Sequence, residues 1–453
     1  MQDRGKERKP TKEEAPRKHD VSFRIYDLLT GDEDARLCRD IPDDQCREQP
    51  KNFLCQVLAQ ALSKTGDALA DTKVVLPWLL GAVGAPGFMV GLLVPIRESL
   101  ALLPQMLIGG VIRRFPVRKG FWSLSSLVEG LCILAMGLAA AAGLSGVAAG
   151  WLILGLLVIF SLARGVASIA AKDTLGKTVS KGRRGRVSGY AASLSGIAAA
   201  AVGIYLAVSP EEARPDWLLT GIVMAAGLAW IAAAAVFYRI DEYPGAIDGG
   251  RSLRDLLRDQ IRLLLKDPEL QKFLLARTLM ISTALVGPAY VGLAQRDSGE
   301  NLAGLGWLMI ASGLAGSVSS AFWGKLADSS SRLTMALAAL LAGLLGLVAV
   351  TGLVTVPDVG SSIVFYAAIL FILGIAHAGV RIGRKTHVVD LAGGDRKAEY
   401  VALSNSIVGV MLLAIGALAS ALMGMSLEVA IVTLSLLSIC GALAALAMTN
   451  AQS

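Results

Sequence analysis

The stretch GKTVSKGRRGRVSGYAASLS, residues 176–195, has a counterpart in GRKTHVVDLAGGDRKAEYVALSN, residues 383–405. Each begins at the end of a long apolar run, passes through basic residues and enters the next apolar run after a tyrosine. The two stretches lie roughly 210 residues apart, about half of the 453-residue chain. Apolar segments joined by the same basic loop and repeated at this distance predict a membrane protein built from a duplicated six-helix unit.

The composition supports a helical membrane protein. Hydrophobic residues make up 54% of the chain and charged residues 17%, and the mean hydropathy is +0.59. A soluble protein would carry about 25% charged residues. Several apolar runs reach the ~20 residues that a helix needs to cross the hydrocarbon layer, and the alternating ~10-residue segments of a β-barrel are missing from the sequence. The predicted fold class is therefore an all-α polytopic membrane protein.

Twelve membrane spans can be placed along the chain. In the first half they are 53–80, 87–109, 119–143, 147–171, 187–208 and 217–238, and in the second half 272–294, 302–325, 333–355, 361–382, 400–421 and 425–447. The expected units are a charged tail (1–52), a first six-helix half (53–238), a linker (239–271), a second half (272–447) and a short tail (448–453). Span 1 is the least apolar, and omitting it would leave eleven spans and an outside N-terminus.

Basic residues predict the orientation of these spans. They gather in one set of loops, at 113–119, 177–186, 251–266, 325–332 and 384–397. The only basic residues in the opposite loops are Arg214 and Arg296. By the positive-inside rule, both termini are expected in the cytoplasm and the protein in the cell inner membrane. Two cytoplasmic termini require an even number of spans, which favours counting span 1.

Two segments outside the spans are expected to contact the membrane domain or its surface. The first 20 residues are dense in charge and lack an apolar signal-peptide core, so we expect them to be disordered. Residues 23–29 can form a short amphipathic helix that docks on the membrane domain or a partner. In the linker, leucines and an isoleucine recur at helical spacing between Leu253 and Leu264, which predicts an amphipathic helix along the cytoplasmic face.

The sequence Gly324-Lys-Leu-Ala-Asp328, followed by Arg332, resembles the signature loop of the major facilitator superfamily. The corresponding loop of the first half, residues 109–119, keeps the glycine and the basic residues but lacks the acidic one. The resemblance covers about residues 53–447. It implies two six-helix halves that rock about a central site and carry a small solute, often with protons. It also implies that Asp328, with Gly324 and Arg332, acts as a conformational latch.

Ionisable residues inside the predicted spans mark the candidate site, because each costs about 2.5–3.5 kcal/mol in a membrane. The candidates among them are Lys64, Asp67, Asp71, Arg97, Glu98, Glu129 and His377. Lys73 lies in span 1, and Arg164 and Lys172 lie in or near the inner part of span 4. The i, i+3, i+7 spacing of Lys64, Asp67 and Asp71 places them on one helix face. One carboxylate can carry a proton and Arg97 can bind an anion. Alternatively, Lys64 pairs with Asp67 or Asp71, Arg97 pairs with a nearby acid, and these ion pairs only fix the packing of the helices. Arg277 and Arg381 are expected to extend to the inner surface.

Other classes of function are not supported by the sequence. Gly176-Lys-Thr178 ends like a phosphate-binding loop, but Ala171 occupies the position of its leading glycine. Three histidines and five scattered cysteines predict neither a metal site nor an enzyme, and we expect no cofactor. The net charge of +7 resides in the loops, so nucleic acid is not an expected partner. The expected function is a monomeric, proton-coupled secondary transporter in the lipid bilayer; the alternative is a transporter-like sensor or scaffold.

Overall fold

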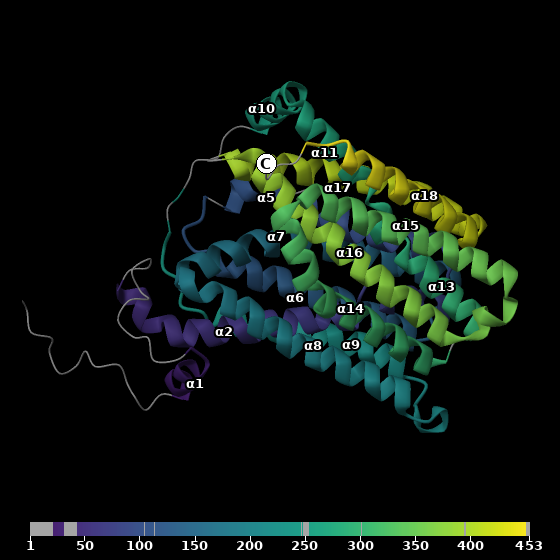
Figure 1. The fold of residues 1–453 in the computed structure, drawn as a ribbon. Helices are drawn as coiled ribbons and strands as arrows, with labels where there is room; N and C mark the ends of the chain where they lie inside the picture. Colours follow the sequence, from purple (N-terminus) through teal and green to yellow (C-terminus); the bar gives the residue numbers. More distant parts are fainter. Residues whose placement is uncertain are drawn as a thin grey trace, which may run out of the picture.

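The protein is a bundle of long α-helices, described here by a computed structural model of residues 21–30, 43–103, 105–112, 114–245, 247, 253–299, 301–393 and 396–449 (Figure 1). Within these ranges the elements are helices and no β-strand occurs. The fold class predicted from the sequence is therefore confirmed. The expected disorder of the first 20 residues lies outside the described part of the chain.

The first half contains six membrane segments. They are α2 (Asp43–Leu69) with α3 (Val75–Ala82), α4 (Gly87–Leu102) with α5 (Gln105–Ile112), α6 (Lys119–Ala141), α7 (Gly146–Thr178), α8 (Arg184–Val208) and α9 (Leu218–Tyr238). Within this half α6 packs against α7 and α9, α2 packs against α8 and α9, and α4 packs against α7. The short helices η1 (Lys181–Arg183) and η2 (Glu211–Ala213) lie in the loops on either side of α8.

The second half repeats this plan. Its segments are α11 (Pro268–Leu279) with α12 (Ser282–Leu285) and α13 (Gly287–Ser298), α14 (Leu302–Ser329), α15 (Ser331–Thr355), α16 (Ile363–Ala392), α17 (Lys397–Met425) and α18 (Leu427–Leu446), with η3 (Pro357–Ser361) between α15 and α16. The α15–α18 contact corresponds to the α6–α9 contact of the first half. Among the described residues, ten segments are long and apolar enough to cross a membrane; α2–α3 and α4–α5 are the two further segments of the bundle.

Prolines accompany interruptions in two segments that the sequence suggested were continuous. Pro77 has no N–H for the carbonyl of Lys73, and its ring would clash with that carbonyl, so α2 and α3 are separated at residues 70–74. Pro288 similarly separates α12 from α13. The first span of each half is thus a broken helix.

The two halves meet through α4 with α17 and α8 with α14. Both contacts need glycine, because the backbones approach closely. A Cβ on Gly306 of α14 would lie 2.6 Å from the amide nitrogen of Ala207 and the carbonyl oxygen of Gly203 on α8. A Cβ on Gly91 of α4 would lie 2.6 Å from the Cα of Ser420 on α17. Small residues at helix crossings are the usual means of close packing in membranes.

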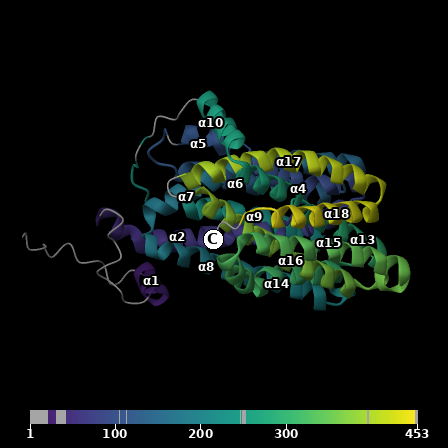
Figure 2. The same ribbon diagram turned by 45° about the horizontal axis from the view of Figure 1, so that its top comes forward.

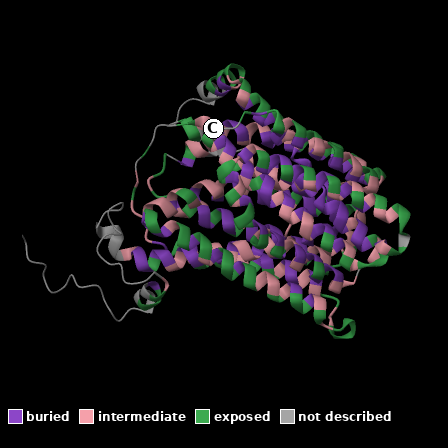
Figure 3. Ribbon diagram, in the orientation of Figure 1, coloured by how far each residue is buried: buried purple, intermediate pink, exposed green. Residues whose placement is uncertain are grey.

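Buried residues run through the interior of the bundle, and exposed and half-buried residues lie along its outside (Figure 3). Many of the exposed side chains are large and apolar. Ile197 on α8, Val318 on α14 and Leu443 on α18 are 69%, 64% and 62% exposed. Exposed apolar side chains on so many helices would aggregate in water, but they match the hydrocarbon of a bilayer. The protein is therefore a multi-pass membrane protein.

Helix α1 (Val21–Thr30) is the predicted short helix, and it docks on the first half (Figure 2). The Tyr26 ring packs edge-on against Phe53 at a centroid distance of 5.3 Å. The guanidinium of Arg183 lies 4.6 Å from the centroid of the same ring. The Tyr190 hydroxyl donates to the carbonyl of Leu29 at 2.7 Å. These contacts connect the N-terminal segment to the loop between α7 and α8.

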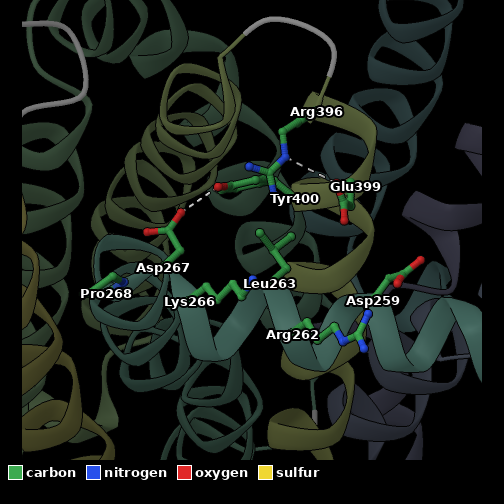
Figure 4. A pocket seen from close by; sticks show the side chains of 9 residues that line it. All are labelled: Asp259, Arg262, Leu263, Lys266, Asp267, Pro268, Arg396, Glu399 and Tyr400. Carbon is green, nitrogen blue, oxygen red and sulfur yellow. Dashed lines mark hydrogen bonds and ion pairs between the residues drawn. The ribbon is translucent and has the colours of Figure 1, made fainter.

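Helix α10 (Leu253–Lys266) occupies the linker and lies outside the bundle, against the start of α11 and α17 (Figures 1 and 4). Asp267 caps α11 by accepting hydrogen bonds from the amides of Glu269 and Leu270 at 3.1 and 3.0 Å. Its other carboxylate oxygen accepts from the Tyr400 hydroxyl at 2.6 Å. A hollow of about 390 Å³ lies beside this contact and is lined by acidic and basic residues alike. Asp267 thus ties the linker to α17.

Candidate functional site

A cavity of about 660 Å³ lies between the two halves. Its walls come from α4 and α7 of the first half and from α11, α12, α15, α16 and α17 of the second. The basic side chains that line it are Lys73, Arg97, Lys172, Arg277, Arg381, Arg384 and Lys385. Glu98 is the one acidic side chain among the described residues of the lining. The cavity is thus strongly basic.

Both broken helices border the cavity. Lys73 lies in the break between α2 and α3, and Ile281, Thr283 and Ala284 lie in and beside the break between α11 and α12. Interrupted helices at corresponding positions of two halves are a known mark of binding sites in transporters, because unwound backbone is tolerated where it lines a cavity. Pro77 and Pro288, about 210 residues apart like the basic loops, could have identified this place from the sequence.

A cluster of charged residues from four helices of the first half adjoins the cavity. Arg97 on α4 donates to Asp67 on α2 at 2.6 Å. Arg164 on α7 also donates to Asp67 and, at 3.2 Å, to Glu129 on α6. Arg97 lies 3.3 Å from Glu98. Because the partners come from α2, α4, α6 and α7, these bonds connect helices as well as balance charge.

Glu129 is the most buried member of this cluster, with a side chain 0% exposed. One of its oxygens accepts from Arg164, and the other has no hydrogen-bond partner among the described residues. A buried carboxylate oxygen without a donor is costly, and protonation of the carboxyl removes most of that cost. Arg164, which the sequence analysis did not include in the site, is the residue that joins Glu129 to Asp67.

Lys64 and Asp71 do not join this cluster. Helix α2 ends at Leu69, so the predicted shared face of Lys64, Asp67 and Asp71 is wrong for Asp71, which lies past the helix end. Its carboxylate accepts from the backbone amide of Lys73 at 2.7 Å. Lys64 donates to the carbonyl of Ser188 on α8 at 3.4 Å instead of pairing with either acid. The helix break at Pro77 is the cause of the first difference.

His377 on α16 lies between the two broken helices. Its Nε2 atom is 3.2 Å from the Lys73 amine, and its Nδ1 atom is 3.3 Å from the Thr283 hydroxyl. That hydroxyl donates to the carbonyl of Met280 at 2.9 Å, so it accepts from His377. An ammonium can only donate. The bonds therefore assign a neutral imidazole with its proton on Nδ1, and this contact joins the first half to the second.

Arg277 does not extend to the surface as predicted. It is 7% exposed and points inward from α11, where it donates to the Ser404 hydroxyl and, at 3.0 Å, to the amide oxygen of Asn405. Its Nε has no partner among the described residues. Arg381 is exposed and lies on the cavity wall. Residue spacing along one helix could not distinguish a cavity from the membrane surface.

The residues of the predicted latch lie at the end of α14 and the start of α15. Asp328 is exposed and makes no hydrogen bond or ion pair to any described residue, and Gly324 has open space around it. Arg332 donates to the carbonyl of Met448 at 2.7 Å. The latch role of Asp328 stays a prediction.

The corresponding region of the first half contains a charge network that the sequence analysis missed. Glu242 accepts from the amide of Arg118 at 2.8 Å and forms an ion pair with Lys177 at 2.9 Å. Asp173 pairs with Arg118 and, at 2.8 Å, with Lys177. The acidic residue absent from the loop 109–119 is thus replaced by two acids from α7 and the segment after α9.

Hydrogen bonds between the halves gather at the end of the bundle opposite the basic loops. Arg214 donates to the side chain of Asn301 at 2.5 Å. Gln295 donates to the carbonyl of Trp78 at 3.2 Å, and Ser420 donates to that of Phe88 at 2.6 Å. The cavity residues lie from the middle of the bundle toward the end with the basic loops. The two halves are therefore joined beyond the cavity at this end, and the Ser99 hydroxyl of α4 also donates to the carbonyl of Gly409 on α17 at 2.6 Å, beside the cavity.

No protein-family model and no curated protein matches the sequence. Solved structures do match the fold. A nucleoside transporter, NupG, superposes with a TM-score of 0.63 at 11% identity, covering 88% of this chain and 98% of that one. A POT family transporter in complex with 5-aminolevulinic acid superposes with a TM-score of 0.65 at 11% identity. This match covers 86% of this chain and 94% of that one.

A D-xylose–proton symporter gives a TM-score of 0.63 at 10% identity, and the match covers 89% of this chain and 98% of the symporter. These matches extend over nearly the whole of each transporter, so they include both six-helix halves. At such low identity the likeness establishes the fold alone. Together with the two pseudo-equivalent halves, it confirms the architecture implied by the Gly324–Asp328 resemblance: this chain has the major facilitator fold.

Proposed function

We propose that this protein is a secondary transporter that moves a small solute across the cytoplasmic membrane by alternating access, coupled to protons. The observation that carries the proposal is the cavity between the halves, which lies toward one end of the bundle, while several hydrogen bonds join the halves at the opposite end. This is the arrangement expected of one state of an alternating-access cycle. Transporters with the same fold include a proton symporter, which supports transport in preference to catalysis.

The cavity is proposed to face the cytoplasm, with both termini on that side. The basic loops lie at the end toward which the cavity extends, and the positive-inside rule places such loops in the cytoplasm. The protein is further proposed to act as a monomer, because each chain already provides both halves of the cavity.

Glu129 is the proposed proton carrier. The cluster contains two guanidiniums, Arg97 and Arg164, and three carboxylates, Asp67, Glu98 and Glu129, so one added proton makes it neutral. Asp67 is held by both arginines. Glu129 accepts a single, longer hydrogen bond from Arg164 at 3.2 Å, and its other oxygen has no hydrogen-bond partner among the described residues. Its protonation would release Arg164 from it and loosen the α6–α7 connection.

The test uses purified protein in liposomes containing a pH-sensitive dye, with nucleosides, sugars, short peptides and organic acids added outside. A transporter of the proposed kind moves protons with at least one solute class. Glu129→Gln should abolish solute-driven proton movement but keep solute exchange between the two sides. Glu269→Gln, a half-buried acid at the start of α11 and outside the cavity, is the matched control. No flux and no exchange of any class would instead support the sensor or scaffold alternative.

A further inference from the structure

The cavity wall contains more positive charge than its own residues balance. Arg97 is neutralised by Asp67 and Glu98. The other six basic side chains of the lining have no ion pair to a described residue. The positive-inside rule explains Lys172 and Lys385, which are exposed. It does not explain basic residues deeper in the cavity.

Arg277 and Lys73 are the deep basic residues. Arg277 is 7% exposed, and its partners, Ser404 and Asn405, are neutral oxygens. Lys73 contacts the neutral ring of His377 at 3.2 Å. A cation at membrane depth is normally paired with an acid, since burial without a counter-charge is unfavourable. Here the described residues provide no such acid for Arg277, and none of them is a hydrogen-bond partner of its Nε.

Helix α16 adds a row of basic residues to the same cavity. His377, Arg381 and Arg384 follow each other at intervals of four and three, which places them on one face of the helix. All three line the cavity, so this face is directed into it. Because α16 faces α4 and α7 across the cavity, a solute between the halves would meet arginines on one side and Lys73 on another.

We propose that the transported solute is a small anion whose carboxylate or phosphate group is bound by Arg277, Arg384 and Lys73. The inference rests on the proposed transport function and names its substrate class. Guanidinium groups bind carboxylates and phosphates through paired hydrogen bonds, and Arg384 and Arg277 provide such groups from two helices. A volume of about 660 Å³ is that of a site for a small organic molecule. Cationic solutes are excluded by the same charges.

The test measures binding to detergent-purified, delipidated protein by thermal shift and by titration calorimetry. The probes are succinate, citrate and glycerol 3-phosphate, with succinamide and glycerol as their uncharged counterparts and putrescine as a cation. At least one anion should stabilise the protein, and its uncharged counterpart should not. Phosphatidylglycerol forms a separate arm, because a lipid head group presents the same oxyanion.

Variants then locate the site. Arg384→Gln should raise the Kd of the anion about tenfold or more, as expected for the loss of a charge-assisted hydrogen bond. Arg384→Lys should keep part of the affinity. Arg277→Gln should have a similar effect to Arg384→Gln, and because Arg277 is buried, its folding is checked by size-exclusion chromatography. Arg239→Gln, on an exposed residue outside the cavity, should bind like the wild type.

The results separate this inference from the proposed function. Binding or transport of an uncharged or cationic solute, with no response to any anion, would overturn the anion inference and leave the transporter proposal standing. A response to phosphatidylglycerol alone, or no response to any probe, would also overturn it. Anion binding that Arg384→Gln weakens, in a protein that exchanges no solute across liposomes, would support the site and contradict the transport function.

Discussion

Removal of the Arg164 side chain is expected to leave the most buried acid of the membrane domain without its cation. Glu129 is fully buried, and Arg164 is its sole hydrogen-bond partner among the described residues. In Arg164→Gln the uncharged amide can still contact Glu129, but it cannot balance the charge. Asp67 would retain Arg97 at 2.6 Å, so the loss falls mainly on Glu129.

The expected loss is about 3–5 kcal/mol in the free energy of unfolding, the usual result when one partner of a buried ion pair is removed. The double variant Arg164→Gln/Glu129→Gln removes both charges. It should regain most of this stability, with roughly 1 kcal/mol still lost for weaker hydrogen bonds. The two sites are in contact, so their effects should not add.

These differences in the free energy of unfolding are measured by unfolding the protein in mixed micelles with increasing SDS, while circular dichroism is monitored. Lys272→Gln is the matched control, because Lys272 forms a surface ion pair with Glu269 at 2.8 Å. Its loss should lower the free energy of unfolding by no more than about 1 kcal/mol. The reasoning is refuted if Arg164→Gln is as stable as this control, or if the double variant is no more stable than Arg164→Gln alone.

Three further predictions concern packing, topology and the latch. Gly306→Leu should separate α8 from α14 and reduce the yield of folded protein in size-exclusion chromatography, whereas Gly313→Ala, which faces open space, should not. A cysteine placed near Arg214 should react with an impermeant thiol reagent from outside the cell, and one near Arg184 should not; the reverse labelling contradicts the orientation. Asp328→Asn should shift cysteine accessibility between the two faces without unfolding; unchanged accessibility argues against a latch.

The fold could be predicted from the sequence because its signals are local. Apolar runs of membrane length and the repeated basic loops each depend on neighbouring residues only. Helix breaks are different, since proline is tolerated inside some membrane helices: Pro95 lies within α4, whereas Pro77 and Pro288 coincide with interruptions. Composition cannot tell these cases apart. The position of Pro77 and Pro288 in corresponding spans is the signal that could have done so.

The site was predicted less well because its contacts join distant helices. Asp67, Arg97 and Glu129 were recognised as costly charges, and they do come together in the structure. Their connecting residue, Arg164, lies in the inner part of a predicted span, and the sequence of that span does not indicate its partners on α2 and α6. Arg277 was assigned to the surface for the same reason. Depth in the membrane follows from sequence, but direction around the helix axis depends on tertiary packing.

The unbalanced charge of the cavity offers a physical reason for coupling solute to conformational change. Lys73 and Lys172 belong to the first half, and Arg277, Arg381 and Arg384 to the second. Closing an empty cavity would bring these cations together, and two unit charges about 4 Å apart repel by roughly 4 kcal/mol at an effective dielectric constant of 20. On the anion inference, a bound carboxylate or phosphate turns that repulsion into attraction to both halves. The empty protein would then stay open to one side, and the loaded one could close and reopen to the other.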